Sequence, residues 1–282
     1  MQYRDYTVLT FEQTAHVVYV SMAHPPLNLL DSILIPELKR FVREVALDDS
    51  ARVIVFQSDV PDFFAAHVDA SYTANPAGFT ALSKDDKGYE GLLPLQHLNA
   101  SVRALPQITI AKLRGYLRGG GNEFAMASDL RYAAEGATWM GQIEARMGII
   151  PGGGGTQLLA RAVGRSRALE AVLTADVYDA RTAELYGWIT RAIPSNQLDQ
   201  HVEAIAERIG FRLPSQIRAA KAAIDPTTAG SQLAADFAME AAALAYVYPA
   251  PLEVEHRMIR AVDDGLQTVE NERNLENFLD QR

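Results

Sequence analysis

The amino-acid sequence predicts an α/β protein in which strands alternate with helices through the first half and helices alone form the remainder. The first observation is composition: 48% of the 282 residues are apolar and 22% are charged, as in globular domains. The second is the alternation of short apolar runs with helical periodicity, and the third is the purely helical pattern beyond residue 157. We expect a core over residues 1–197 and a helical region over residues 198–282.

The amino-terminal segments predict a hairpin followed by a helix. Residues 7–11 and 16–22 have the composition of strands, and residues 12–14 supply the turn between them. Residues 36–47 place apolar side chains three and four positions apart, which is the spacing of one helical face.

Short apolar runs at residues 53–56, 108–111 and 130–133 predict further strands, of the kind that a sheet buried on both faces requires. Residues 70–92 lie between two of them, have no firm period and predict a mobile insertion. Because strands alternate with helices here, we expect right-handed βα units and a parallel core.

The rest of the chain predicts helices alone. They are expected over residues 158–163, 168–173, 180–186 and 198–209, and an Ala-rich tail begins at Pro214. Because proline ends or breaks helices, Pro214, Pro226 and Pro249 should divide that tail into separate helices.

Charge and cysteine content exclude several functions. The chain has 26 Lys and Arg against 35 Asp and Glu, a net charge of −9, so repulsion opposes nucleic-acid binding. The absence of cysteine excludes disulfides, thiolate nucleophiles and thiolate zinc sites. The amino terminus does not resemble a secretory signal, and no apolar run reaches the roughly 18 residues of a membrane span. We expect a soluble, cytoplasmic protein with neither nucleic-acid nor membrane partners.

Two glycine clusters, residues 119–121 and 152–155, are the candidate functional motifs. Neither is followed by Lys-Ser or Lys-Thr, which excludes a P-loop, and neither has the third glycine of a dinucleotide fingerprint. The nearest match to a serine-hydrolase elbow, residues 164–168, lacks the final glycine. Since no His-Glu-x-x-His pair occurs, no metal site is predicted.

The first cluster runs from a strand into a helix that begins near Asn122. A helix start offers N–H groups without intrahelical partners, and glycines let another group approach them closely. Glu123 lies three residues after Gly120, so this arrangement suits an oxyanion held beside a proton-transferring carboxylate. Alternatively, Glu123 assists the helix terminus and the glycines allow tight packing. A second carboxylate, Glu144, would by itself be a solvated loop residue.

The glycine clusters belong to an ordered set of motifs that extends over most of the chain. The set comprises Pro25-Pro26-Leu27-Asn28-Leu29-Leu30, Gly115-Tyr116, Gly119-Gly120-Gly121-Asn122-Glu123, Ser128-Asp129-Leu130, Gln142-Ile143-Glu144, residues 148–157, Ala162-Val163-Gly164-Arg165 and residues 180–193. This order resembles the crotonase (enoyl-CoA hydratase/isomerase) superfamily. The resemblance implies a spiral of ββα turns and a helical carboxyl-terminal region, residues 198–282, that assembles homotrimers or dimers of trimers.

Members of this family bind an acyl-CoA thioester and stabilise its enolate with two backbone N–H groups. The resemblance assigns these donors to Gly120 and to Val68, the latter within Phe64-Ala65-Ala66-His67-Val68-Asp69. It also places further residues against the substrate, namely Leu27, Ala66, His67, Asp69 and Gly119. No cofactor or metal is expected beyond the thioester substrate, whose carrier is CoA or a protein-bound pantetheine.

The resemblance also implies a reaction. Family hydratases hold one water between two glutamates, and Glu123 and Glu144 match both positions. Glu123 would take a proton from water as it attacks the β-carbon, and Glu144 would deliver a proton to the α-carbon. Burial should raise both pKa values, opposed at Glu123 by the helix start. The prediction is an enoyl-CoA hydratase-like lyase; the alternatives are an isomerase, decarboxylase or thioester hydrolase of this fold, or a non-catalytic oligomeric scaffold.

Several positions depart from the family pattern. His67 replaces a glycine, which costs roughly 1–2 kcal/mol if the position requires a positive φ. Its side chain is either an ordinary packed or surface histidine, or a polar contact or third proton-transfer group in the pocket. Ile143 replaces a frequent proline, and Arg118 replaces an aromatic or small residue; either could reshape the acyl pocket. Residues 265–278, where the family often carries lysines near the CoA phosphates, hold one positive charge.

Overall fold

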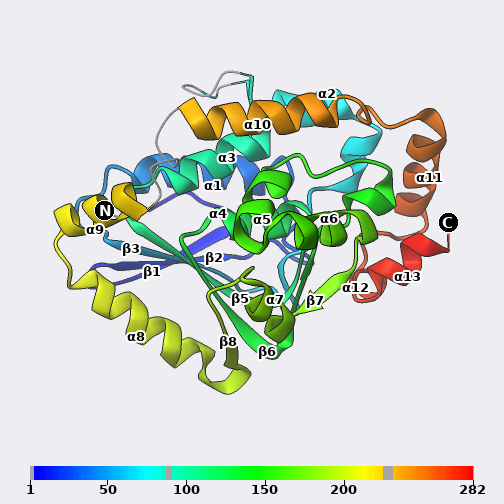
Figure 1. Ribbon diagram of the computed structural model, residues 1–282. Helices are drawn as coiled ribbons and strands as arrows, with labels where there is room; N and C mark the ends of the chain where they lie inside the picture. Colours follow the sequence, from blue (N-terminus) through cyan, green and yellow to red (C-terminus); the bar gives the residue numbers. More distant parts are fainter. Residues whose placement is uncertain (1–2, 85, 87–90, 225–230, 282) are drawn as a thin grey trace.

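The computed structural model describes residues 3–84, 86, 91–224 and 231–281, within which the strands form an eight-stranded sheet (Figure 1). The strands are β1 (Leu9–Thr14), β2 (Val17–Met22), β3 (Val53–Ser58), β4 (Phe63–Ala65), β5 (Ile108–Arg118), β6 (Leu130–Gly141), β7 (Val177–Asp179) and β8 (Arg191–Pro194). Their order is β1-β2-β3-β5-β6-β7, with β4 beside β5 and β8 beside β6. The predicted α/β class is confirmed.

Parallel pairing dominates the centre of the sheet. β1 and β2 form an antiparallel hairpin, whereas β2–β3, β3–β5 and β5–β6 are parallel pairs. β5 and β6 run for 11 and 12 residues, well beyond the short apolar runs that predicted them. A register shift between Leu113 and Gly115 interrupts the apolar pattern while the ladder continues past it. Because the bulge interrupts the apolar pattern, the continuous apolar runs predict only the first half of each strand.

Helices cover both faces of the sheet. They are α1 (Leu34–Val45), α2 (Pro76–Ala81), α3 (Pro94–Arg103), α4 (Gly120–Ala127), α5 (Gly155–Val163), α6 (Arg165–Thr174), α7 (Ala180–Tyr186), α8 (Leu198–Gly210), α9 (Pro214–Ile224), α10 (Ser231–Leu244), α11 (Leu252–Asp263), α12 (Val269–Glu272) and α13 (Leu275–Asp280). Figure 1 shows α8 along one side of the sheet, and α1, α3 and α10 on the other. Across the described residues, no helix has the length and apolar character that a bilayer crossing needs.

The sheet separates two apolar cores because successive side chains of a strand point to opposite faces. On one face, Ile54 and Phe56 join the large core with α1, α3 and α4. On the other face, Val53 and Val55 pack with apolar residues of α8, among them Val202. Helix α8 thus packs directly on the sheet, and the predicted boundary at residues 197 and 198 stays a prediction.

Two local expectations are wrong. β1 continues to Thr14, so the predicted turn at residues 12–14 is displaced to Ala15, whose positive φ of 49° closes the hairpin. The predicted insertion at residues 70–92 holds two helical elements, η1 (Ala70–Thr73) and α2. Asn75 caps α2 and Pro76 is its first residue, which are local start signals that a search for apolar periodicity passes over. Residues 85 and 87–90, and Pro226, lie outside the described residues.

The carboxyl-terminal helices pack beside the loop that follows β4. A small apolar cluster joins the two parts: Met258, Ala261, Leu266, Leu275 and Leu279 contact Ala70 and Ile143. Ala70 follows the predicted oxyanion segment, and Ile143 precedes Glu144 in the sequence. The helices at the end of the chain therefore lie against both halves of the candidate site.

Gly121 allows α4 to approach β4 closely. A Cβ atom at Gly121 would lie 1.9 Å from the carbonyl oxygen of Ala65, so Gly121→Ala should lower the free energy of unfolding by about 1–3 kcal/mol. At the control position, Gly210, the nearest atoms to an added Cβ lie 3.6 Å away, and Gly210→Ala should stay within about 1 kcal/mol of wild type. Urea unfolding measures both; wild-type stability of Gly121→Ala would contradict the close approach.

Candidate active site

A cavity lies where α4 begins, bounded on one side by Leu244 of α10 and by Tyr248. Its wall is largely apolar, with side chains from Val68, Tyr72, Phe79, Leu93, Leu95, Ile143, Met147, Ile149, Ile150, Leu244 and Tyr248. Seven of the nine predicted site residues also line it: His67, Val68, Asp69, Gly119, Gly120, Glu123 and Glu144. An apolar cavity with a few convergent polar groups is the usual form of a small-molecule site.

The glycines between β5 and α4 place a free amide at the cavity. Gly119 is the N-cap of α4, has a φ of 44°, and donates its N–H to the carbonyl oxygen of Gly141 at 2.9 Å. Gly120 is the first helical residue, so its N–H has no intrahelical acceptor. A Cβ atom at Gly120 would lie 2.5 Å from Cγ2 of Val68. The helix start and the Val68 loop are therefore in contact.

The backbone of Val68 is held by a parallel bridge to Leu30. The N–H of Leu30 donates to the carbonyl oxygen of His67 at 2.9 Å, and the N–H of Asp69 donates to that of Leu30 at 3.2 Å. In such a bridge the central residue directs its own N–H and carbonyl away from the partner strand. The Val68 N–H is thus outside the bridge, on a residue that lines the same cavity as Gly120.

Glu123 lies in the first turn of α4 and is buried. Its Oε1 atom accepts two backbone hydrogen bonds, from the N–H groups of Gly153 and Gly155, each at 2.8 Å. The second glycine cluster therefore binds the carboxylate that follows the first. Both glycines are closely packed: a Cβ atom at Gly155 would lie 2.7 Å from Oε1 of Glu123.

Glu144 begins the short 3-10 helix η2 (Glu144–Met147) and lines the same cavity. Its side chain is buried, and among the described residues Oε2 has no hydrogen-bond partner. Its Oε1 atom lies against the turn before α4, at 2.7 Å from the position of a Cβ atom on Gly119. A buried carboxylate oxygen without a partner calls for a ligand, a water molecule or a proton.

The two carboxyl groups both bind protons more tightly than an exposed glutamate does. Burial raises the pKa of Glu144 to about 7. Burial, together with the negative charges of Glu144 and Glu240, raises the pKa of Glu123, and the two glycine N–H groups oppose this shift. These directions match the expectation from the sequence.

The sequence model of the family described as enoyl-CoA hydratase/isomerase matches residues 12–260. The chain belongs to this family. The predicted resemblance to the crotonase superfamily is confirmed, as is the prediction of an enzyme of this family.

Individual relatives carry hydratase names. Human mitochondrial methylglutaconyl-CoA hydratase is 36% identical over 170 residues, which cover 60% of this chain but only 48% of that protein. The probable enoyl-CoA hydratase echA8 of Mycobacterium tuberculosis is 32% identical over 221 residues, or 78% of this chain and 82% of that protein. A solved structure from Streptomyces avermitilis, provisionally named an enoyl-CoA hydratase, has a TM-score of 0.90 and 38% identity and covers 98% of both chains.

Two residues predicted to contact substrate lie away from the cavity wall. Leu27 and Ala66 are fully buried and pack with Val60 and Phe63 in a small apolar cluster. The N–H of Ala66 donates to the carbonyl oxygen of Leu27 at 3.0 Å, so the two segments support the Val68 loop from behind. Their contact with a substrate stays a prediction.

The departures from the family pattern have partners in the carboxyl-terminal helices. His67 is buried and its φ is not positive, so the conditional strain does not arise. Its Nε2 atom lies 2.8 Å from Oε1 of Glu272. Arg118 is fully buried and does not line the cavity; its Nε donates to Oε1 of Glu276 at 2.6 Å. Ile143 does line the cavity.

The sequence analysis missed Glu240 of α10, a third buried carboxylate beside the site. It accepts hydrogen bonds from the N–H groups of Gly154 and Thr156, at 2.5 and 2.9 Å. Four consecutive N–H groups, of residues 153–156, therefore alternate between Glu123 and Glu240. The available signal was spacing: Glu240 shares a helical face with Phe237 and Leu244, whose side chains are buried.

The raised pKa of Glu144 predicts a pH dependence of stability. The unfolded chain releases this proton near pH 4.5 and the native state releases it near pH 7, so native stability falls between these values. Glu144→Gln removes the effect. As the pH rises from 4.5 to 7, the free energy of unfolding of wild type should therefore fall by about 3 kcal/mol relative to that of Glu144→Gln. Denaturant unfolding at several pH values measures this. Glu170→Gln, on the exposed side of α6, is the control; parallel curves for Glu144→Gln and wild type would contradict the raised pKa.

Proposed function

We propose that this protein adds water across the double bond of a 2-enoyl thioester. The observation that carries the proposal is the pair of buried carboxyl groups, Glu123 and Glu144, facing one cavity whose wall also holds Val68 and Gly120. A conjugated thioester bound there would place its carbonyl oxygen against the two amides and its double bond between the two acids. Preorganised donors of this kind stabilise the enolate formed on addition.

The proposed reaction balances with one water molecule. Glu123 takes a proton as the water oxygen forms a bond to the β-carbon, and the π electrons move to the thioester oxygen. Glu144 then gives its proton to the α-carbon, which restores the carbonyl. A proton passed from Glu123 to Glu144 returns the site to its first state. A pKa of about 7 for Glu144 suits a group that must hold and release a proton near neutral pH.

Retention of both carboxyl groups supports hydration over the alternatives. Moving a double bond or removing carboxylate needs fewer proton-transferring groups than adding water to two carbons. The apolar wall, with Phe79, Leu95 and Met147, supports an acyl chain of hydrocarbon character. The carrier of that chain, CoA or a protein-bound pantetheine, stays within the proposal, as does a cytoplasmic setting.

An oligomer completes the proposal. Large apolar side chains are exposed in the carboxyl-terminal region, among them Phe211, Leu213, Ile224, Tyr246 and Leu252. Exposed apolar groups of this size favour contact with another chain. We propose a homotrimer or a dimer of trimers formed through this region. Light scattering tests it, and a mass of 30.9 kDa in solution, that of one chain, would contradict it.

Incubation with crotonyl-CoA tests the proposed activity. Loss of the enoyl absorbance with formation of a 3-hydroxyacyl thioester is the expected result. Formation of a 2-enoyl thioester from a 3-enoyl one without hydration would instead identify an isomerase, and release of free thiol would identify a hydrolase. No conversion of any of these thioesters would support a non-catalytic scaffold and overturn the proposal.

A further inference from the structure

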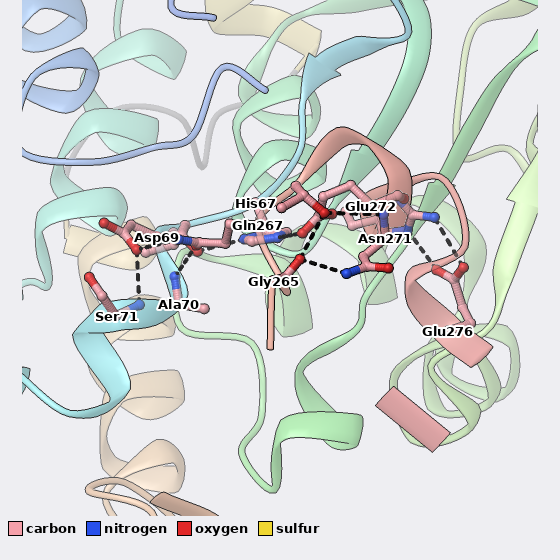
Figure 2. Close-up of polar contacts among 12 residues, drawn as sticks. His67, Asp69, Ala70, Ser71, Gly265, Gln267, Asn271, Glu272 and Glu276 are labelled. Atoms are coloured by element: carbon pink, nitrogen blue, oxygen red, sulfur yellow. Dashed lines mark hydrogen bonds and ion pairs between the residues drawn. The ribbon is translucent and has the colours of Figure 1, made fainter. Parts of the chain in front are cut away.

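A buried polar network connects the Val68 loop to the end of the chain. Figure 2 shows two groups of polar contacts between these parts of the chain: Gln267 with Asp69 and Ala70, and His67 with Glu272. About 200 residues of sequence separate the two sides. The proposed hydration chemistry uses none of the carboxyl-terminal residues, so their burial beside the site needs another explanation.

The first contact fixes the proton on one side of the His67 ring. Nδ1 lies 2.7 Å from the carbonyl oxygen of Val68, and a carbonyl oxygen can only accept, so Nδ1 carries a proton and donates. Nε2 lies 2.8 Å from Oε1 of Glu272. The imidazole ring therefore bridges the Val68 peptide and the side chain of α12. This bridge is 3% exposed at His67 and 0% exposed at Glu272.

Glu272 is itself held by Arg118. One guanidinium nitrogen of Arg118 donates to the carbonyl oxygen of Glu272 at 3.1 Å, and two others bind both carboxylate oxygens of Glu276, at 2.6 and 3.0 Å. A two-point contact of this kind fixes both position and orientation. Arg118 ends β5, immediately before the glycines that lead into α4. The contact between Glu272 and His67 is thus tied, through Arg118, to the strand β5, which also places Gly120.

A second anchor lies on the other side of Val68. Oε1 of Gln267 accepts the N–H of Ala70 at 2.7 Å, and its Nε2 donates to Oδ1 of Asp69 at 3.0 Å. Together with the Leu30 bridge, these contacts fix the residues before and after Val68. The Nδ1–H of His67 adds a hydrogen bond to the carbonyl oxygen of Val68, in the peptide group that follows Val68. The preceding peptide group, which carries the Val68 N–H, is held by the bond from the N–H of Leu30 to the carbonyl oxygen of His67.

We infer that His67 and Glu272 are a positioning pair, which fixes the backbone on both sides of Val68 so that the Val68 N–H points at the thioester oxygen. The inference rests on the proposed function, because that function assigns the Val68 N–H to the oxygen. Neither residue exchanges a proton with the substrate in this arrangement. The carboxyl-terminal segment thereby becomes part of the oxyanion site. At the position where the family has a glycine, His67 fixes the loop conformation through its side chain.

The charges around the ring agree with this assignment. Burial lowers the pKa of His67, but its contacts with the carboxylate of Glu272 and the carbonyl of Val68 outweigh burial, so the net pKa is raised, which favours the protonated ring. Arg118 opposes this, and the cation in turn lowers the pKa of Glu144. With a proton on both nitrogens, the ring donates to Val68 and to Glu272 at once.

A polarisable thioester measures the effect at the carbonyl itself. The probe is 2,4-hexadienoyl-CoA, whose absorption moves to longer wavelength when its carbonyl is polarised; Glu123→Gln serves as parent protein so that the probe is not hydrated. The parent should bind the probe with a red shift. Adding His67→Ala or Glu272→Ala should remove at least about half of the shift while the Kd changes less than about threefold. In the wild-type background the same changes should lower kcat for crotonyl-CoA by about 10- to 100-fold at nearly constant KM.

Conservative and neighbouring variants complete the test. Glu272→Gln can donate its amide N–H to Nε2 while Nδ1 still donates to Val68, so it should keep the shift that Glu272→Ala loses. Glu270→Ala, at an exposed position of the same helix α12, should leave shift and kcat unchanged. Should His67→Ala not fold, the two Glu272 variants decide alone. An unchanged shift in the alanine variants, or equal loss in Glu272→Gln and Glu272→Ala, overturns the inference. Absence of a shift in the parent overturns the proposed function, and the inference with it.

Discussion

Glu123→Gln is expected to lower kcat for enoyl thioester hydration by about 10²- to 10⁴-fold, the contribution of a positioned general base. The substitution is nearly isosteric, and the amide oxygen can still accept both glycine N–H groups that Oε1 of Glu123 accepts. The fold and the thioester site should therefore persist while proton transfer is lost. Steady-state kinetics with crotonyl-CoA, combined with thermal unfolding, separates the two effects.

Glu135→Gln is a matched control, because it makes the same substitution at a glutamate that does not line the cavity. Glu135 lies in β6, pairs with exposed Arg181 and is remote from the cavity wall. Glu135→Gln should retain wild-type kinetics, because an exposed ion pair contributes little. If Glu123→Gln kept kcat within about tenfold of this control, Glu123 would only stabilise the start of the helix and would take no part in catalysis.

The parts of the site that the sequence predicted are those encoded by short local motifs. Gly120 and Glu123 follow from a strand that runs through glycines into a helix, and their separation along the chain already fixes their relative position. Glu144 required the resemblance, since nothing in its neighbours distinguishes it from a loop glutamate. In the structure it lies against Gly119, on the same cavity as Glu123.

The parts that escaped prediction depend on contacts between distant segments. Glu240 and Glu272 lie in α10 and α12, and both carboxylates are buried against segments more than 80 residues away. The periodicity of a helix does not predict that Glu240 will bind the Gly154 turn or that Glu272 will contact His67. The same reason applies to Arg118, which is expected at the acyl pocket from the sequence but is buried in an ion pair with Glu276, 158 residues further along the chain.

The glycine cluster at residues 152–155 is a local motif whose binding partners come from distant segments of the chain. Gly153 and Gly155 give their N–H groups to Glu123, and the two residues interleaved with them give theirs to Glu240. A side chain at Gly155 would collide with Gln142 at 1.9 Å. Residues 153–155 must therefore lack side chains so that both carboxylates can approach the backbone of this turn. A glycine cluster in the sequence indicates such an approach without saying which groups make it.

Val68→Pro should lower kcat by about 10²- to 10³-fold, which corresponds to the loss of one oxyanion donor. Proline removes the N–H of residue 68, and the bridge to Leu30 uses the neighbouring residues' groups, so the strand pairing can remain. Val68→Ala keeps the N–H and loses the methyl groups that touch Gly120; its kcat should stay within about tenfold of wild type. The red shift of bound 2,4-hexadienoyl-CoA, measured in the Glu123→Gln background, should be lost in Val68→Pro and kept in Val68→Ala. Equal kcat in the two variants would mean that the thioester oxygen is bound without this amide, and Gly120 would then have to act with a different donor.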